Sequence, residues 1–149
     1  MVAIQITAER TIDAPATRVY SYIADYRQHH PRFLPPAFSN FEVEQGGVGA
    51  GTVIRFRVKA GGRTQEYHQR VSEPVPGRTI SESNIDSDLT TSFTVTPDGR
   101  NCRVQITTTW QRAGIGGVIE RLFAPRLLSP LYADELERLN RYAKEQAKG

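Results

Sequence analysis

The chain has 149 residues, of which 38% are hydrophobic and 23% are charged, and its formal net charge is +3. This length suits one domain, because domains commonly span about 100–150 residues and then need no disulfide or metal to stabilise the core. The single cysteine, Cys102, excludes an internal disulfide framework and a thiolate zinc cluster. A mild positive charge without blocks of like charge does not indicate a nucleic-acid-binding protein.

The sequence carries no membrane or export signal that we can identify. No stretch approaches the roughly 20 consecutive apolar residues of a membrane-spanning helix. Residues 1–12 lack the basic start and the continuous apolar segment of a signal peptide. We therefore expect a soluble, cytoplasmic protein without stable membrane insertion, present as a monomer or a homodimer.

The first predicted element is a strand over residues 2–12, because apolar and polar side chains alternate there. Arg10 interrupts the apolar face of this strand. A short helix follows, for which Asp13 is the expected cap. Pro15 fits the first turn, where its missing N–H has no helical partner. A proline-rich loop over residues 31–37 ends this helical region.

Short alternating segments separated by turn sequences then run from residue 38 to residue 111. The predicted strands cover residues 41–44, 52–60, 63–73, 78–84, 89–96 and 101–111. Closing the turns gives the pairs Phe56–Tyr67, Gln69–Glu82, Val71–Ile80, Ile80–Phe93 and Phe93–Val104. Opposed residues share a face, and all four turns agree on which residues those are. The pattern predicts an antiparallel meander with one covered face and one wet, threonine-rich face.

The last segment, residues 115–147, has apolar residues at intervals of three and four. This spacing predicts a long amphipathic helix, broken or bent by Pro125 and Pro130. We expect it to cover the apolar face of the meander. The residues expected to face the sheet are Ile115, Val118, Ile119, Leu122, Phe123, Leu128, Leu131, Tyr132, Leu136, Leu139 and Tyr142.

Turn and capping motifs carry a family resemblance. They are Ile12-Asp13-Ala14-Pro15-Ala16, the turn sequence over residues 73–80, and Leu122-Phe123-Ala124-Pro125. With this element order, residues 1–149 resemble a single domain of the polyketide cyclase/dehydrase branch of the START-like (SRPBCC, Bet v 1-like) superfamily. The resemblance implies an α+β helix-grip fold, in which a curved seven-stranded antiparallel sheet wraps around a long C-terminal helix. It also implies two short helices between strands 1 and 2, and a cavity between sheet and helix for lipids or polyketides.

Polar side chains lie on the predicted covered face, where a plain core would have valine or leucine. They are Gln65, Tyr67, Gln69, Glu82 and Asn84. Burying such groups without partners costs about 1–3 kcal/mol each. They form either a hydrogen-bonding wall of a ligand cavity, or a mutually bonded network, or a sheet end open to water. Glu82 is the only carboxylate among them; burial would raise its pKa and suit it to acid–base chemistry, whereas bonding to Gln69 would make it structural.

Aromatic side chains at inward positions are core residues in most domains, but they line the cavity in a cavity-forming fold. The residues predicted to bind a ligand are Phe33, Phe56, Tyr67, Gln69, Glu82, Asn84, Phe93, Trp110, Leu128 and Tyr132. We expect the ligand to pass the Pro31–Pro36 loop and the Gly46–Gly51 turn, and to lie between the sheet and residues 118–139.

Other motifs do not indicate a cofactor or a metal. His29 and His30 are adjacent at a helix end, so their side chains point about 100° apart and chelate a metal poorly. At most, one of them acts at the cavity mouth. The glycine-rich turn over residues 46–51 precedes a strand, whereas a phosphate-binding loop precedes a helix. The basic residues of the wet face, Arg55, Arg57, Lys59 and Arg70, are expected to be solvated, with no nucleic-acid partner.

Three functions remain open from the sequence, and no catalytic residue is assigned. The first is a non-enzymatic binder or carrier of a small hydrophobic molecule. The second is a cyclase- or dehydratase-like enzyme in the same cavity, in which Glu82 with Tyr67, or a histidine, would transfer a proton. The third is a protein-interaction module, which an exposed apolar strip on the last helix would indicate.

Overall fold

The structure is a computed structural model that describes residues 1–148. Along the chain, a strand, a short helix and a single 3-10 turn precede six further strands and a long helix. These elements are β1 (Val2–Ile12), α1 (Ala16–Ala24), η1 (His30–Phe33), β2 (Phe38–Gln45), β3 (Val53–Ala60), β4 (Arg63–Val75), β5 (Thr79–Asn84), β6 (Thr90–Asp98), β7 (Asn101–Arg112) and α2 (Gly114–Lys148).

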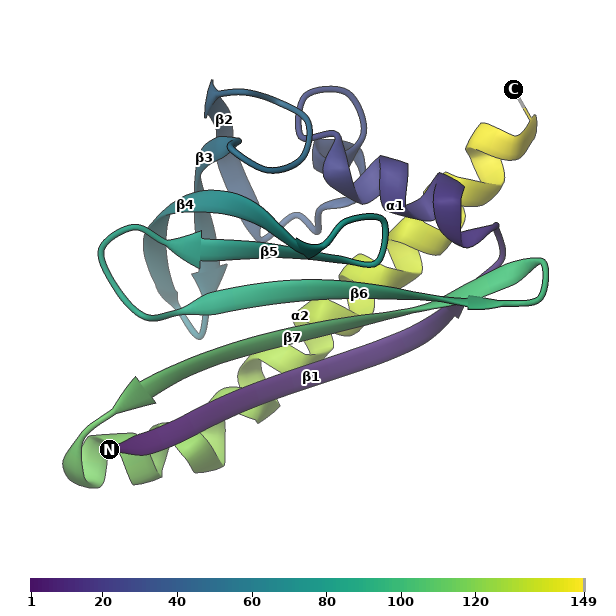
Figure 1. The fold of residues 1–149 in the computed structure, drawn as a ribbon. Helices are drawn as coiled ribbons and strands as arrows, with labels where there is room; N and C mark the ends of the chain where they lie inside the picture. The colour runs from purple at the N-terminus through teal and green to yellow at the C-terminus, as the bar shows by residue number, and fades with distance from the viewer. Residues whose placement is uncertain (149) are drawn as a thin grey trace.

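The strands form one antiparallel sheet in the order β1-β7-β6-β5-β4-β3-β2. Figure 1 shows α2 crossing one face of this sheet, from the N-terminal end of β1 towards α1. The curved sheet with a long C-terminal helix confirms the predicted α+β helix-grip fold. The apolar core lies between the inner face of the sheet, α1 and the second half of α2.

The predicted strand register is correct at some turns and two residues out at others. The pairs Phe56–Tyr67 and Ile80–Phe93 are confirmed. Between β4 and β5, however, Val71 pairs with Glu82. The hairpin closes at Val75–Thr79, which moves the register by three residues, and one extra residue that bulges out of β4 between Ser72 and Val75 takes back one, so the net shift is two. Between β6 and β7, the loop contains only residues 99–100 and not the predicted residues 97–100, so the register moves by two residues. The corrected pairs are Val71–Glu82 and Gln69–Asn84 in the first case, and Phe93–Ile106 with Asp98–Asn101 in the second. A shift of two residues leaves every side chain on its predicted face.

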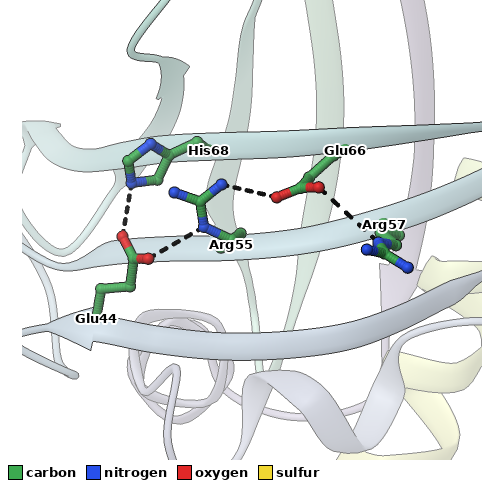
Figure 2. Close-up of polar contacts among 5 residues, drawn as sticks. All are labelled: Glu44, Arg55, Arg57, Glu66 and His68. Carbon is green, nitrogen blue, oxygen red and sulfur yellow. Dashed lines mark hydrogen bonds and ion pairs between the residues drawn. The ribbon is translucent and has the colours of Figure 1, made fainter.

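The outer face of the sheet carries an exposed chain of ion pairs, shown in Figure 2. Arg55 on β3 bonds Glu44 on β2 at 3.0 Å and Glu66 on β4 at 2.7 Å. His68 lies 2.6 Å from the other oxygen of Glu44, and Arg57 pairs with Glu66 at 3.9 Å. The hydrogen bonds from Arg55 lower the pKa of both carboxyls. Exposed pairs of this kind contribute at most about 1 kcal/mol each to stability. This face is therefore solvated, and its acidic residues offset the positive charge of its arginines.

The long helix α2 is continuous through Pro125 and Pro130, which excludes the predicted alternative of a break and leaves that of a bend. Its two halves differ in burial. In the second half, Leu136 and Leu139 are 1% and 0% exposed, as expected. The first-half residues Ile115, Val118, Ile119, Leu122 and Phe123 are exposed by half or more, so the prediction that they pack on the sheet is wrong. No helix within residues 1–148 combines the length and apolar character that a membrane crossing requires.

Asp13 does not cap α1, contrary to the sequence prediction. The cap position is Pro15, and no side chain bonds the first turn. Asp13 instead joins β1 to α2: its N–H donates to Asn140 Oδ1 at 2.8 Å, and Lys144 Nζ lies 3.2 Å from its carboxylate. The bond from Lys144 is the largest cause that lowers the pKa of Asp13.

Candidate functional site

A cavity of about 820 Å³ lies between the inner face of the sheet and α2. Volumes of this size are typical of small-molecule sites, which are mostly apolar with a few placed polar groups. Its apolar wall is aromatic along β2, β3 and β4: Phe41 lies 6.0 Å from Phe56, and Phe56 lies 5.3 Å from Tyr67, between ring centres. Phe93 and Trp110 extend the wall across β6 and β7.

Nine of the ten residues predicted to bind a ligand line this cavity. They are Phe56, Tyr67, Gln69, Glu82, Asn84, Phe93, Trp110, Leu128 and Tyr132. Their contact with a ligand remains a prediction. Phe33 is the exception: it is fully buried behind the wall, where its ring packs 4.7 Å from His30 and 6.2 Å from Tyr142. Its location in a proline-rich loop suggested a cavity mouth, but η1 turns the ring into the core.

The predicted cavity opening is supported at one of its two segments. Leu34 of the Pro31–Pro36 loop lines the cavity and is half-buried. The Gly46–Gly51 turn is tied to the end of α1, because Tyr26 N–H donates to Gly47 O and Gly49 N–H donates to Ala24 O, and it does not line the cavity. The exposed lining residues are Arg63, Gln65, Glu66, Ser87, Ile119, Phe123 and Leu127. The opening therefore lies between the β3–β4 hairpin, the β5–β6 turn and the first half of α2.

The inner end of the cavity holds two carboxyls and a histidine, all buried. His30 Nε2 lies 3.8 Å from Glu82 Oε2 and 3.9 Å from Glu135 Oε2, and neither distance is a hydrogen bond. His30 Nδ1 is 2.7 Å from Ile23 O, so this nitrogen carries the proton and Nε2 is the free acceptor. Tyr26 donates its hydroxyl to Glu82 Oε2 at 2.8 Å. We call Glu82, Glu135 and His30 the buried triad.

The turn after α1 fixes His30 in this place. Asp25 Oδ1 accepts bonds from the N–H groups of Arg27 and Gln28, and Asp25 O accepts from His30 N–H at 2.8 Å. Aspartate commonly organises such turns by bonding its own following backbone. The Tyr26 ring then stacks on the His30 imidazole at 4.6 Å.

Burial favours the neutral form of all three members of the triad. It raises the pKa of Glu82 from 4.5 to about 7, while the bond from Tyr26 opposes this rise. Burial, followed by repulsion from Glu82, raises the pKa of Glu135. Burial lowers the pKa of His30 to about 4. Titratable groups perturbed in this way are concentrated at functional sites.

The remaining polar wall is only partly bonded within itself. Gln69 Nε2 donates to Asn84 Oδ1 at 2.8 Å, but Gln69 Oε1 has no partner within residues 1–148. Tyr67 donates to Gln65 Oε1 at 2.9 Å. On the opposite side, Thr91, Thr108 and Tyr132 form a chain of hydroxyls with spacings of 2.7 and 2.6 Å. The predicted bond between Glu82 and Gln69 does not form, because Asn84 is the residue opposite Gln69.

Two residues of this site are not among those predicted from the sequence. One is Glu135, which lies three residues after Tyr132 and four before Leu139, and so interrupts the apolar stripe of α2. A carboxylate on an apolar helix face is a usable signal for a buried site. His30 was expected at most at the mouth and lies instead at the inner end, because the turn that buries it is not evident from the helical pattern.

The fold and this cavity define a helix-grip protein of the START-like, Bet v 1-like class. The chain belongs to the family described as "Polyketide cyclase / dehydrase and lipid transport", which it matches over residues 3–144. It is 28% identical over 124 residues to Pathogenesis-related protein 2 of Petroselinum crispum, covering 76% of this chain and 78% of that protein.

Solved structures agree with this assignment. The solution structure of KanY protein is 30% identical, with a TM-score of 0.84 over 97% of this chain and 99% of that one. The Zhui aromatase/cyclase from Streptomyces sp. R1128 is 17% identical, with a TM-score of 0.77 over 97% and 96% of the two chains. The second likeness concerns the fold alone.

Proposed function

We propose that this protein binds a small hydrophobic molecule in the cavity between the sheet and α2, and holds a polar group of that molecule at the buried triad. The observation that carries the proposal is a cavity of about 820 Å³ whose wall is aromatic and whose inner end is polar. Apolar burial supplies affinity at about 25 cal/mol per Å² of covered surface, while the few polar groups fix orientation.

A cavity-filling substitution tests this proposal. Leu128 lines the cavity from α2, so Leu128→Trp is expected to weaken binding of a hydrophobic ligand by about tenfold or more, because the indole occupies ligand space. Leu122→Trp is the matched control, since Leu122 is 62% exposed on the same helix. Calorimetry with fatty acyl, sterol-like and polycyclic aromatic compounds is the measurement. Equal binding by both variants and the wild type, or no binding of any class by the wild type, would contradict the proposal.

The buried triad supports a second candidate, an acid–base enzyme in the same cavity. A protonated Glu82 beside an unprotonated His30 nitrogen provides a general acid and a general base within 3.8 Å of each other. Family membership is compatible with cyclase or dehydrase chemistry as well as transport. Loss of turnover in Glu82→Gln with retained binding would favour the enzyme, whereas retained turnover would exclude this role for Glu82.

The exposed strip on the first half of α2 is relevant to the interaction-module hypothesis. Ile119, Phe123 and Leu127 line the cavity, so their exposure fits an opening through which a ligand passes. Ile115, Val118 and Leu122 are 79%, 50% and 62% exposed and do not line it, so they are the part of the strip that the cavity does not explain. We favour the cavity as the functional surface because half of the strip belongs to its opening.

A further inference from the structure

The inner end of the cavity has more hydrogen-bond acceptors than donors. Gln69 is 2% exposed, and its Oε1 is unpartnered within residues 1–148. His30 Nε2 is an acceptor, because the Nδ1 proton is already given to Ile23 O. The Glu135 carboxyl makes no hydrogen bond to the described part of the chain, although it is only 3% exposed. Even when both carboxyls keep their protons, acceptors outnumber the donors left for a ligand.

No permanent positive charge offsets the two carboxyls. Within residues 1–148, His30 is the only basic side chain within 4.0 Å of Glu82 or Glu135, and burial disfavours its charged form. The groups that act on the carboxyls from the surrounding elements are Tyr26 after α1, His30 on η1, and Tyr132 and Asp134 on α2. Arg63 on β4 also lines the cavity, but it is exposed at the opening and pairs with neither carboxyl. None of the groups at the two carboxyls is a cation at neutral pH. A buried carboxyl pair of this kind gains most from a partner that brings positive charge and N–H donors.

The aromatic wall suits the rest of such a ligand. Phe38, Phe41 and Tyr67 surround Phe56 at ring distances of 5.5, 6.0 and 5.3 Å. Their faces can cover an apolar or aromatic body, and they also attract a nearby cation. A ketone or ester at the triad would instead add another acceptor to a region already rich in acceptors.

We infer that the ligand carries a protonated amine on an apolar body, with the ammonium group between Glu82 and Glu135 and a further N–H donated to Gln69 Oε1 or His30 Nε2. This inference rests on the proposed function and names the chemical class of the ligand. Binding then releases a proton from the triad to the solvent, because the ammonium stabilises the ionised carboxyl. The affinity for the amine rises with pH, since fewer protons must be displaced.

The test compares naphthylethylamine with naphthylethanol, a neutral molecule of nearly the same shape, by calorimetry at pH 6 and pH 8. The amine is expected to bind about tenfold or more tightly than the alcohol at pH 8, and its advantage is expected to shrink at pH 6. Comparing the binding enthalpy in two buffers of different ionisation enthalpy gives the number of protons released on binding. In the Glu82→Gln/Glu135→Gln double variant the advantage disappears, because neither amide can ionise to pair with the ammonium and the amine then binds no more tightly than the alcohol to the same variant.

A matched control distinguishes the effect of the buried carboxyls from the effect of the protein's overall charge on amine binding. Glu137→Gln removes an exposed carboxylate of α2 that pairs with Arg141 outside the cavity, and it leaves the amine's advantage unchanged. Equal affinity of amine and alcohol in the wild type, or an advantage that survives in the double variant, overturns the inference and leaves the proposed function standing. Failure of both probes to bind the wild type counts against the proposed function itself and removes the basis of the inference.

Discussion

The free energy of unfolding is expected to be lower at pH 8 than at pH 5, mainly because the buried carboxyls must ionise. The pKa of Glu82 is about 7 in the folded protein against 4.5 in its ordinary state. Below about pH 4.5 the protonated Glu82 contributes its full amount to the free energy of unfolding. This contribution is lost as the pH rises through the folded pKa. At about 1.4 kcal/mol per pH unit, this loss amounts to roughly 3 kcal/mol.

The other two members of the triad also change how the free energy of unfolding depends on pH. Glu135 acts in the same direction, because burial raises its pKa too. His30 acts in the opposite direction between about pH 4 and pH 6.5, since its pKa is lowered on folding to about 4 and the unfolded chain binds the extra proton there. The net loss of stability is therefore steepest above about pH 6.5, where the histidine no longer offsets it.

Urea unfolding across this pH range checks the prediction. Glu82→Gln keeps an acceptor for Tyr26 but cannot ionise, so the difference between pH 5 and pH 8 is expected to shrink by about 3 kcal/mol. Glu137→Gln, at an exposed position on α2, serves as the control with a wild-type profile. A Glu82→Gln profile parallel to that of the wild type would contradict the account.

Leu139→Ala is expected to destabilise the protein by about 2–5 kcal/mol, the usual range for a leucine truncated in a packed core. Leu139 is 0% exposed, where the second half of α2 packs on the sheet. Leu122→Ala, in the exposed first half of the same helix, should change stability by less than about 0.5 kcal/mol. Chemical denaturation of both variants is the measurement. Similar losses in the two variants would mean that α2 packs along its whole length, against the structure.

The strand pattern could be predicted from the sequence because alternation and turn residues are local signals. The predicted faces are correct despite the register errors, because both errors are shifts of two residues. Between β4 and β5 the shift combines closure of the hairpin at Val75–Thr79 with the bulge after Ser72, and between β6 and β7 it comes from the shorter turn after Asp98. Two-residue shifts keep each side chain on its face, so Gln69 and Glu82 reach the cavity as predicted even though they do not pair. The bulge itself depends on tertiary packing, which the alternation does not encode.

Burial along α2 and around η1 could not be predicted in the same way. The apolar spacing of α2 is similar in both halves, but the first half lies at the cavity opening, so Leu122 and Phe123 stay exposed. Gly117 lets the start of α2 approach β1 closely, since a Cβ at this position would lie 2.9 Å from Val2 Cβ. His30 is buried by a turn that Asp25 organises through side-chain bonds. These contacts join segments far apart in sequence, which periodicity cannot detect.

The most direct test of the central claim uses the lone tryptophan, Trp110, which lines the cavity and donates its indole N–H to Glu120 at 2.8 Å. A ligand in the cavity displaces water from the indole face, so titration with hydrophobic compounds should produce a saturable blue shift or quench of its emission. Leu128→Trp is unsuitable here, because it adds a second fluorophore. A saturable response from one compound class is the predicted result. Binding detected by calorimetry with no change in Trp110 emission would place the ligand outside this cavity and contradict the account.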